Sequence, residues 1–119
     1  MSQRNDQRRV QDMLEAIERI ERYAAEGRDA FVTNELLQTW VVHHLQIIGE
    51  AAARISDDQK VKHPEVPWKA ITGMRNILVH DYFGIDLDIV WQAVENDIPA
   101  LKRQVIVLVE VQPTDSSTT

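Results

Sequence analysis

The sequence predicts an all-α protein, an antiparallel up-and-down bundle of four to five helices. Three observations favour this: apolar residues recur at helical spacing through most of the 119 residues, strand-like alternation is missing, and the connections are short. Hydrophobic residues make up 44% of the chain and charged residues 27%, as in ordinary globular domains. We expect one domain over residues 1–112 and a disordered polar tail over residues 113–119.

The first expected helix carries one apolar stripe and ends near Gly27, a residue suited to a helix C-terminus. Glutamate and arginine at i,i+4 spacing, as in Glu15 and Arg19, are expected on its solvent-exposed side. The stripe consists of Val10, Met13, Leu14, Ile17, Ile20 and Ala24.

Thr33 or Asn34 is suited to cap a second helix, because both side chains accept bonds from free backbone N–H groups. Ser56, with the two aspartates after it, reads as the end of that helix or as the cap of a short extra turn. Residues 59–66 are polar and are expected to form a connector. The apolar stripe of the second helix consists of Leu37, Trp40, Val41, His44, Ile48, Ala51, Ala52 and Ile55.

Pro67 fits the first turn of a third helix, where its missing N–H does no harm, and Gly84 should end that helix. Asp86 is a good cap for a fourth helix, whose apolar face runs to Leu108. Pro99 falls inside this helix and costs about 3 kcal/mol unless the helix bends. We therefore expect a last helix kinked at Pro99, or a restart capped by Asn96 or Asp97.

The composition and the sequence signals indicate the cellular compartment in which the protein is found. The chain has no cysteine, which excludes disulfides and thiolate metal sites and favours a reducing compartment. The N-terminal residues resemble no signal peptide, and no apolar run reaches the roughly 20 residues that span a bilayer. We expect a cytoplasmic protein with no membrane partner.

The net charge is −6, and it is evenly distributed. Residues 1–60 contain 8 basic and 11 acidic groups, and residues 61–119 contain 5 and 8, so neither half is basic. Broad non-specific binding of nucleic acid requires clustered lysine and arginine, and this balance argues against it. A small local phosphate site remains compatible with the sequence.

The third helix carries the residues most suited to chemistry: Arg75, Asn76, His80 and Tyr82. Asn76 and His80 share a face at i,i+4, whereas Arg75 lies about 140° from His80 around an ideal helix. Convergence on one ligand therefore needs a helix end or a second protomer. Histidine exchanges protons near neutral pH, arginine offers a fork of donors to phosphate, and tyrosine adds a hydroxyl and a stacking face.

Spacing alone leaves a structural alternative open. Arginine and histidine occur within one and a half helical turns by chance, so a short motif carries a false-positive risk. Arg75 would then pair with an acidic residue, and His80 would be a hydrogen-bonded interior histidine.

Longer stretches of the chain resemble the HepT branch of the HEPN superfamily of ribonucleases. They match in order and cover nearly the whole chain apart from its ends. The stretches are DMLEAIERI (12–20), LQIIGEAAARIS (45–56), PEVPWKAITGMRNILVHDYFGID (64–86), VW (90–91) and IPAL (98–101).

The resemblance implies a HEPN-like helical bundle that forms a homodimer and cleaves RNA as a toxin, without metal or other cofactor. It implies a composite site near the dimer interface, with Arg75 and His80 catalytic and Asn76 a polar helper. It also implies a minimal nucleotidyltransferase (MNT) antitoxin that transfers AMP to Tyr82. An alternative is a non-catalytic nucleotide- or substrate-binding partner subunit of such a nucleotidyltransferase, and the acidic balance favours it somewhat. A third possibility is a purely structural dimer that holds the antitoxin.

Other polar and aromatic residues receive structural interpretations. His43 and His44 are adjacent, so one helical face cannot present both, and His44 should be buried against a polar partner or a second protomer. Glu50 is expected to need an arginine partner, with Arg75 the candidate. Gly49 should allow close helix packing. His63 is isolated in the connector, and the tryptophans, expected in the core or an interface, are Trp40, Trp68 and Trp91.

Overall fold

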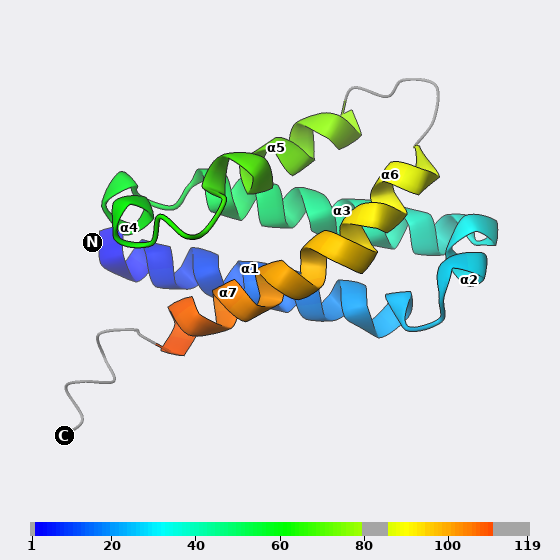
Figure 1. Ribbon diagram of the computed structural model, residues 1–119, viewed down its shortest axis with the longest axis horizontal. Coiled ribbons are helices and arrows are strands. Elements are labelled where there is room, and N and C mark those ends of the chain that lie inside the picture. The colour runs from blue at the N-terminus through cyan, green and yellow to red at the C-terminus, as the bar shows by residue number, and fades with distance from the viewer. Residues whose placement is uncertain (1, 80–85, 111–119) are drawn as a thin grey trace.

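The computed structural model describes residues 2–79 and 86–110, and in these residues every regular element is helical (Figure 1). The predicted all-α class is therefore confirmed. The long elements are α1 (Ser2–Ala24), α3 (Glu35–Ala53), α5 (Trp68–Val79) and the continuous run α6 (Leu87–Gln92), η1 (Ala93–Asp97) and α7 (Ile98–Glu110). Two six-residue helices, α2 (Arg28–Thr33) and α4 (Asp57–Lys62), lie in the connections.

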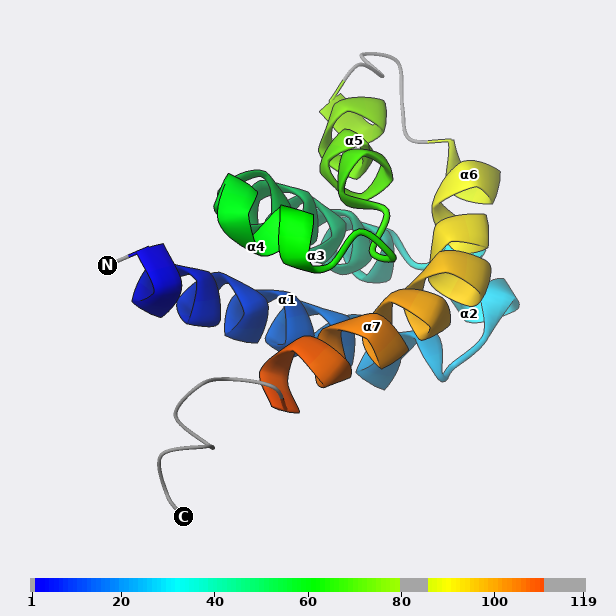
Figure 2. The same ribbon diagram turned by 60° about the vertical axis from the view of Figure 1, so that its left-hand side comes forward.

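Successive long helices run in opposite directions, as expected for an up-and-down bundle (Figure 1). Helix α3 packs against α1 on one side and α5 on the other, and α7 crosses α1 (Figure 2). The order through the bundle is thus α5, α3, α1 and α7. Within the described part of the chain, helix α5 packs mainly against α3.

The core is built from the apolar stripes that the sequence predicts. Met13, Ile17, Val41 and Ile48 have no exposed surface, and they come from the facing sides of α1 and α3. Each such side chain contributes about 1.5–3 kcal/mol when it leaves water. The fourth stripe completes the same core with Val90, Trp91, Val94, Ile98, Leu101, Val105 and Leu108.

The helix ends follow the expected local chemistry. Gly27 has a φ of +96°, a conformation that glycine adopts without strain, and the chain turns there after α1. Asn34 caps α3 by accepting a bond from the backbone N–H of Leu37 at 3.1 Å. Ser56 caps α4, which decides between the two readings of that residue. Helix α5 begins one residue after Pro67.

Two short helices differ from the prediction. Helix α2 was not expected, because six residues are too few to show a period, and only Phe31 of this helix is buried. Helix α4 includes the first residues of the stretch expected to be a connector, so that expectation was wrong for residues 59–62. The Ser56 cap stabilises this turn although the turn buries no side chain.

The disturbance expected near Pro99 takes the form of a π-helical turn. The backbone N–H of Ile98 donates to the carbonyl of Ala93, five residues back, so the turn just before the proline is widened. The prolyl ring has no N–H and would clash with the carbonyl four residues before it, and a widened turn relieves that clash. Asn96 and Asp97 lie inside this turn instead of capping a restart.

No helix in residues 2–79 and 86–110 is long and apolar enough to cross a bilayer. The expected helix stop at Gly84, the domain boundary at residue 112 and the tail over residues 113–119 lie outside the described residues.

Candidate functional site

Helices α3 and α5 approach closely at Gly49. A β-carbon at this position would lie 3.1 Å from Cβ of Arg75, 3.2 Å from its backbone N and 3.3 Å from the carbonyl oxygen of Ile71. Such distances are tighter than ordinary van der Waals contacts, so any larger residue would require α5 to shift by a few tenths of an ångström. The prediction that Gly49 permits close packing is confirmed, and its consequence is that Arg75 lies beside the next residue, Glu50.

Glu50 links two arginines from different helices. Its Oε2 atom lies 3.2 Å from Nη1 of Arg75 on α5, and its Oε1 atom lies 3.8 Å from Nε of Arg54, four residues along α3. The expected pairing of Glu50 with Arg75 is therefore present. The Glu50 side chain is 53% exposed, however, so it is not a buried carboxylate that requires a partner. Exposed ion pairs contribute about 0–1 kcal/mol, so the cluster adds little to stability.

A cleft of about 580 Å³ opens beside this cluster, between α1, α3 and α5. Pockets that hold small molecules have volumes of about 300–1,000 Å³. Three guanidiniums and two carboxylates line the cleft, which gives it one net positive charge in a chain whose total is −6. The lining residues are Arg9, Asp12, His43, Gln46, Ile47, Glu50, Ala51, Arg54 and Arg75.

Most of these lining residues were not predicted from the sequence. On α3, His43, Ile47, Glu50 and Arg54 recur at intervals of four, three and four residues, which places them on one face of the helix. This face is distinct from the apolar stripe that packs in the core. A search for polar periodicity as well as apolar periodicity would have found these residues. It would not have shown that Arg9 of α1 faces them.

The four predicted site residues are described to different extents. Arg75 lies on α5 at the cleft, with its side chain 33% exposed. Asn76 lies on α5, but its side chain is outside the described part of the structure, and His80 and Tyr82 fall within residues 80–85, which are also outside it. Helix α5 is described through Val79, so His80 follows it directly.

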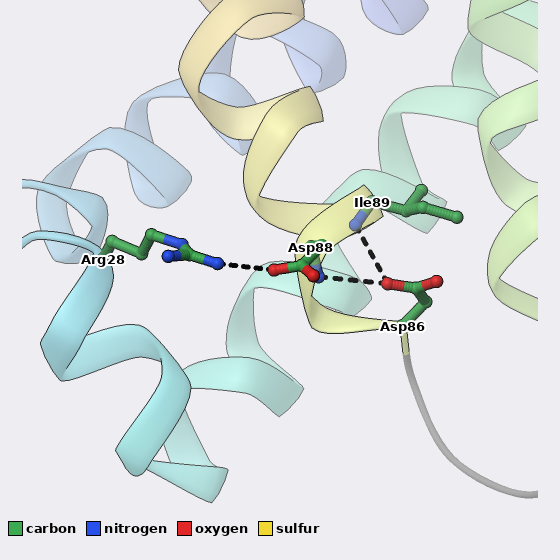
Figure 3. Close-up of polar contacts among 4 residues, drawn as sticks. All are labelled: Arg28, Asp86, Asp88 and Ile89. Atoms are coloured by element: carbon green, nitrogen blue, oxygen red, sulfur yellow. Dashed lines mark hydrogen bonds and ion pairs between the residues drawn. The ribbon is translucent and has the colours of Figure 1, made fainter.

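The far side of this segment is anchored at the start of α6 (Figure 3). The Asp86 carboxylate accepts bonds from the backbone N–H groups of Asp88 and Ile89 at 3.1 and 3.2 Å, which confirms the predicted cap. Arg28 of α2 donates to the Asp88 carboxylate at 2.5 Å. In the sequence, residues 80–85 link α5, which packs closely on α3 at Gly49, to α6, which begins after the Asp86 cap.

The adjacent histidines occupy opposite environments. His43 is exposed and lines the cleft. His44 is 3% exposed, and its Nδ1 atom lies 2.7 Å from the Trp40 carbonyl oxygen. Burial lowers the pKa of His44, the bond to the Trp40 carbonyl opposes this, and the charges of His43 and Arg19 lower it further. His44 thus has the buried structural role with a polar partner that the sequence analysis favoured.

The tryptophans are structural within the described residues. Trp91 is 8% exposed, and its ring centroid lies 5.3 Å from that of Phe31. Trp40 donates from Nε1 to the carbonyl of Arg19, and Trp68 donates from Nε1 to the carbonyl of His63. None of the three lines the cleft. In the part of the chain that the structure describes, no group of three or more His, Asp or Glu side chains is arranged to hold a metal ion.

A family model described as Ribonuclease HepT-like matches residues 13–108, from the middle of α1 nearly to the end of α7. The chain belongs to this family. The matched region includes Gly49, Glu50 and Arg75 as well as residues 76–82, so the resemblance seen in the sequence is confirmed at the level of the family.

Individual relatives agree with this HepT-like membership. A Methanocaldococcus jannaschii protein, provisionally named an RNase, is 38% identical over 106 residues, which cover 88% of this chain and 97% of that protein. A Thermococcus cleftensis protein named "Probable ribonuclease HepT" is 43% identical over 94 residues, covering 78% and 86%.

A third HepT-like relative is larger. This Methanocaldococcus jannaschii protein, whose name joins a gamma-glutamylcyclotransferase to a provisional RNase, is 39% identical over 99 residues. The match covers 82% of this chain and 45% of the relative, so the HepT-like unit occurs there within a longer chain. No solved structure gave a significant match.

Proposed function

We propose that this HepT-like protein is a metal-independent endoribonuclease toxin in which Arg75 and His80 are the catalytic residues. The observation that carries the proposal is the position of Arg75. Its guanidinium is partly exposed at a cleft of ligand size, is oriented by Glu50, and lies on the helix that leads directly to His80. The names of the relatives support RNA as the substrate.

The chemistry follows from the two side chains. The ribose 2′-oxygen attacks the adjacent phosphorus while a base takes the 2′-hydroxyl proton, and the bond from phosphorus to the 5′-oxygen breaks. His80 acts as that base or as the acid that protonates the departing oxygen, because imidazole exchanges protons near neutral pH. The Arg75 fork binds the non-bridging oxygens, where negative charge increases in the transition state. The products end in a 2′,3′-cyclic phosphate and a 5′-hydroxyl.

A homodimer completes the proposed site. Arg75 and His80 lie about 140° apart around a regular helix, so one uninterrupted helix does not direct both at one phosphate. Pairing of two chains near α5 would bring two copies of each residue together, with Asn76 as a polar helper. Helix α5 packs mainly against α3 among the described residues, which supports placing the contact between the two chains there.

The same proposal assigns Tyr82 as a control point. A minimal nucleotidyltransferase antitoxin would transfer AMP from ATP: the phenol oxygen bonds to the α-phosphorus, pyrophosphate leaves, and the phenol proton is released. The added group is bulky and anionic, two residues from His80. It would exclude the RNA phosphate by size and by charge.

Cleavage of RNA by purified protein in EDTA tests the nuclease. The wild type should release 2′,3′-cyclic phosphate ends, and His80→Ala should lose about 10²–10⁴-fold in rate, the usual contribution of a general acid or base. The His63→Ala variant removes a histidine that does not line the cleft and should keep the wild-type rate. Wild-type protein that binds RNA or nucleotide but never cleaves would instead support the binding-subunit alternative.

Intact mass after co-expression with a neighbouring nucleotidyltransferase tests the control point. The wild type should gain the mass of one AMP group and lose its nuclease activity, and Tyr82→Phe should gain nothing and remain active. Modification at Tyr23, the other tyrosine of the chain, would contradict the assignment.

A further inference from the structure

The cleft contains a set of cationic side chains that the proposed chemistry at Arg75 and His80 does not use. Arg9 lies on α1 and Arg54 is the C-cap residue of α3, and both line the cleft together with Arg75 of α5. Three separate helices thus direct guanidiniums at one hollow. Elsewhere the chain is acidic, so this concentration of arginine is local.

Arg9 is the most informative of these residues. Its side chain is only partly exposed, yet it forms no ion pair or hydrogen bond with any residue that the structure describes. An aspartate, Asp12, lies one turn along the same helix, and even this carboxylate does not pair with it. A guanidinium that faces a cleft without an acidic partner is available to an anion.

Arg54 is also available, for a different reason. Its contact with Glu50 is long, at 3.8 Å, and its side chain is 62% exposed. Glu50 lies nearer to Arg75, at 3.2 Å, and is the carboxylate that the two arginines share. One carboxylate does not neutralise two guanidiniums, so Arg54 retains donors for a second anion.

We propose that this cleft is an RNA-backbone subsite in which Arg9 and Arg54 bind phosphates of the strand that flank the phosphate held by Arg75. The proposal rests on the nuclease function proposed above and adds how the substrate is held. Successive phosphates of one strand need several cationic groups in a row, and a hollow of about 580 Å³ with two extra guanidiniums provides them. The His43 ring and the Ile47 side chain give the cleft a wall against which a base can lie.

Salt-dependent binding of a non-cleavable RNA tests the subsite. The probe is a fluorescein-labelled pool of short 2′-O-methyl RNAs, which lack the attacking hydroxyl, and the readout is anisotropy of the full-length protein over a range of salt concentrations. Arg9→Gln and Arg54→Gln should each weaken binding roughly tenfold and make the slope of log K against log salt shallower by about 0.7, one phosphate contact on a single strand.

The chain offers matched controls. Arg8→Gln removes the neighbouring arginine, which is exposed and points about 100° away around α1, and Arg103→Gln removes an exposed arginine of α7. Both change the net charge by the same amount as the cleft variants, and both should bind like the wild type. Arg9→Lys and Arg54→Lys should restore the salt slope, which guards against a variant that fails only because it misfolds.

The outcomes separate the two proposals. Cleft variants that bind no worse than the Arg8 and Arg103 variants, or a wild type that does not bind the probe, would overturn the subsite. If the subsite failed in this way while the wild type still cleaved RNA, the nuclease proposal would remain and only the subsite would be rejected. Binding that depends on Arg9 and Arg54 in a protein that never cleaves RNA would retain the subsite and remove the nuclease.

Discussion

The two halves of α3 differ in whether their polar side chains bond to the backbone of the bundle or remain exposed. In the first half, the ring N–H groups of Trp40 and His44 donate hydrogen bonds to backbone carbonyls, those of Arg19 and Trp40 respectively. His44 is almost completely buried. In the second half, Glu50 and the C-cap residue Arg54 are more than half exposed, and Glu50 forms ion pairs with both Arg54 and Arg75. Trp40 and His44 thus use their polar groups within the bundle, whereas Glu50 and Arg54 leave theirs available to a ligand.

The contrast predicts which half carries activity and which carries stability. Changes at the α3–α5 crossing should alter RNA cleavage with little effect on unfolding. Changes at Trp40 and His44 in the first half of α3, and at the helix caps, should alter the free energy of unfolding.

The largest effect is expected from Arg75→Lys. Lysine keeps the charge but loses the planar fork that matches phosphate, so the cleavage rate should fall by about 10²–10³-fold, as when one oxyanion donor is removed. The free energy of unfolding in urea should change by less than about 1 kcal/mol, because the ion pair with Glu50 is half-exposed.

Arg19→Lys is the matched control for that change. Arg19 also forms an exposed ion pair, with Glu15, but it lies on α1 and does not line the cleft. It should cleave at the wild-type rate. A strong loss of stability in the Arg75 variant would mean that the contact between Glu50 and Arg75 stabilises the fold instead of positioning a catalytic residue.

A smaller effect is expected from Gly49→Ala. The new methyl group would press on backbone atoms of α5 and displace Arg75, so cleavage should fall roughly tenfold, in keeping with the sensitivity of catalysis to small misplacements. Alanine is the better helix former by about 1 kcal/mol, which offsets the strain, so the thermal midpoint should move little.

Gly73→Ala is the control within α5. A β-carbon there meets nothing within 4 Å, so the variant should gain about 0.5–1 kcal/mol in stability and keep its activity. Equal activity losses in the two alanine variants would contradict a specific role for the crossing at Gly49.

Asp86→Ala should affect stability by about 1 kcal/mol, the usual value of a helix cap. The carboxylate satisfies two backbone N–H groups at the start of α6, next to the segment that contains His80 and Tyr82. Chemical denaturation measures the loss, and Asp86→Asn should restore most of it because asparagine also caps. An alanine variant as stable as the wild type would show that the cap does not hold this end of the segment.

The smallest effect at neutral pH is expected at His44, in the first half of α3, and it concerns the stability of the fold. Its pKa is lowered in the folded state, so between that pKa and the ordinary value of 6.5 the unfolded chain binds more protons than the folded one. Stability is therefore complete above pH 6.5 and falls as the pH drops toward the folded pKa. Urea denaturation between pH 7.5 and pH 5.5 should show this loss.

His44→Gln should reduce that pH dependence, whereas His43→Gln should keep most of it, because burial is the main cause of the shift and the His43 charge a lesser one. The same slope in the wild type and in His44→Gln would show that His44 does not titrate in this range.

The sequence by itself determined the helical class, the apolar stripes, the caps at Asn34, Ser56 and Asp86, and the family, because these depend on residues near one another along the chain. It also pointed to Arg75 through a short motif. Periodicity could not reveal α2, nor that the response to Pro99 is a π-helical turn.

Only the tertiary structure decided that Glu50 reaches both Arg54 and Arg75, and that Arg9 faces the same cleft. Arg9 and Arg75 are far apart in sequence and share no helical face. Their proximity depends on the crossings of α1, α3 and α5, and these are set by side-chain volumes in the core and by the missing side chain of Gly49. Spacing along one chain segment contains no information about such crossings.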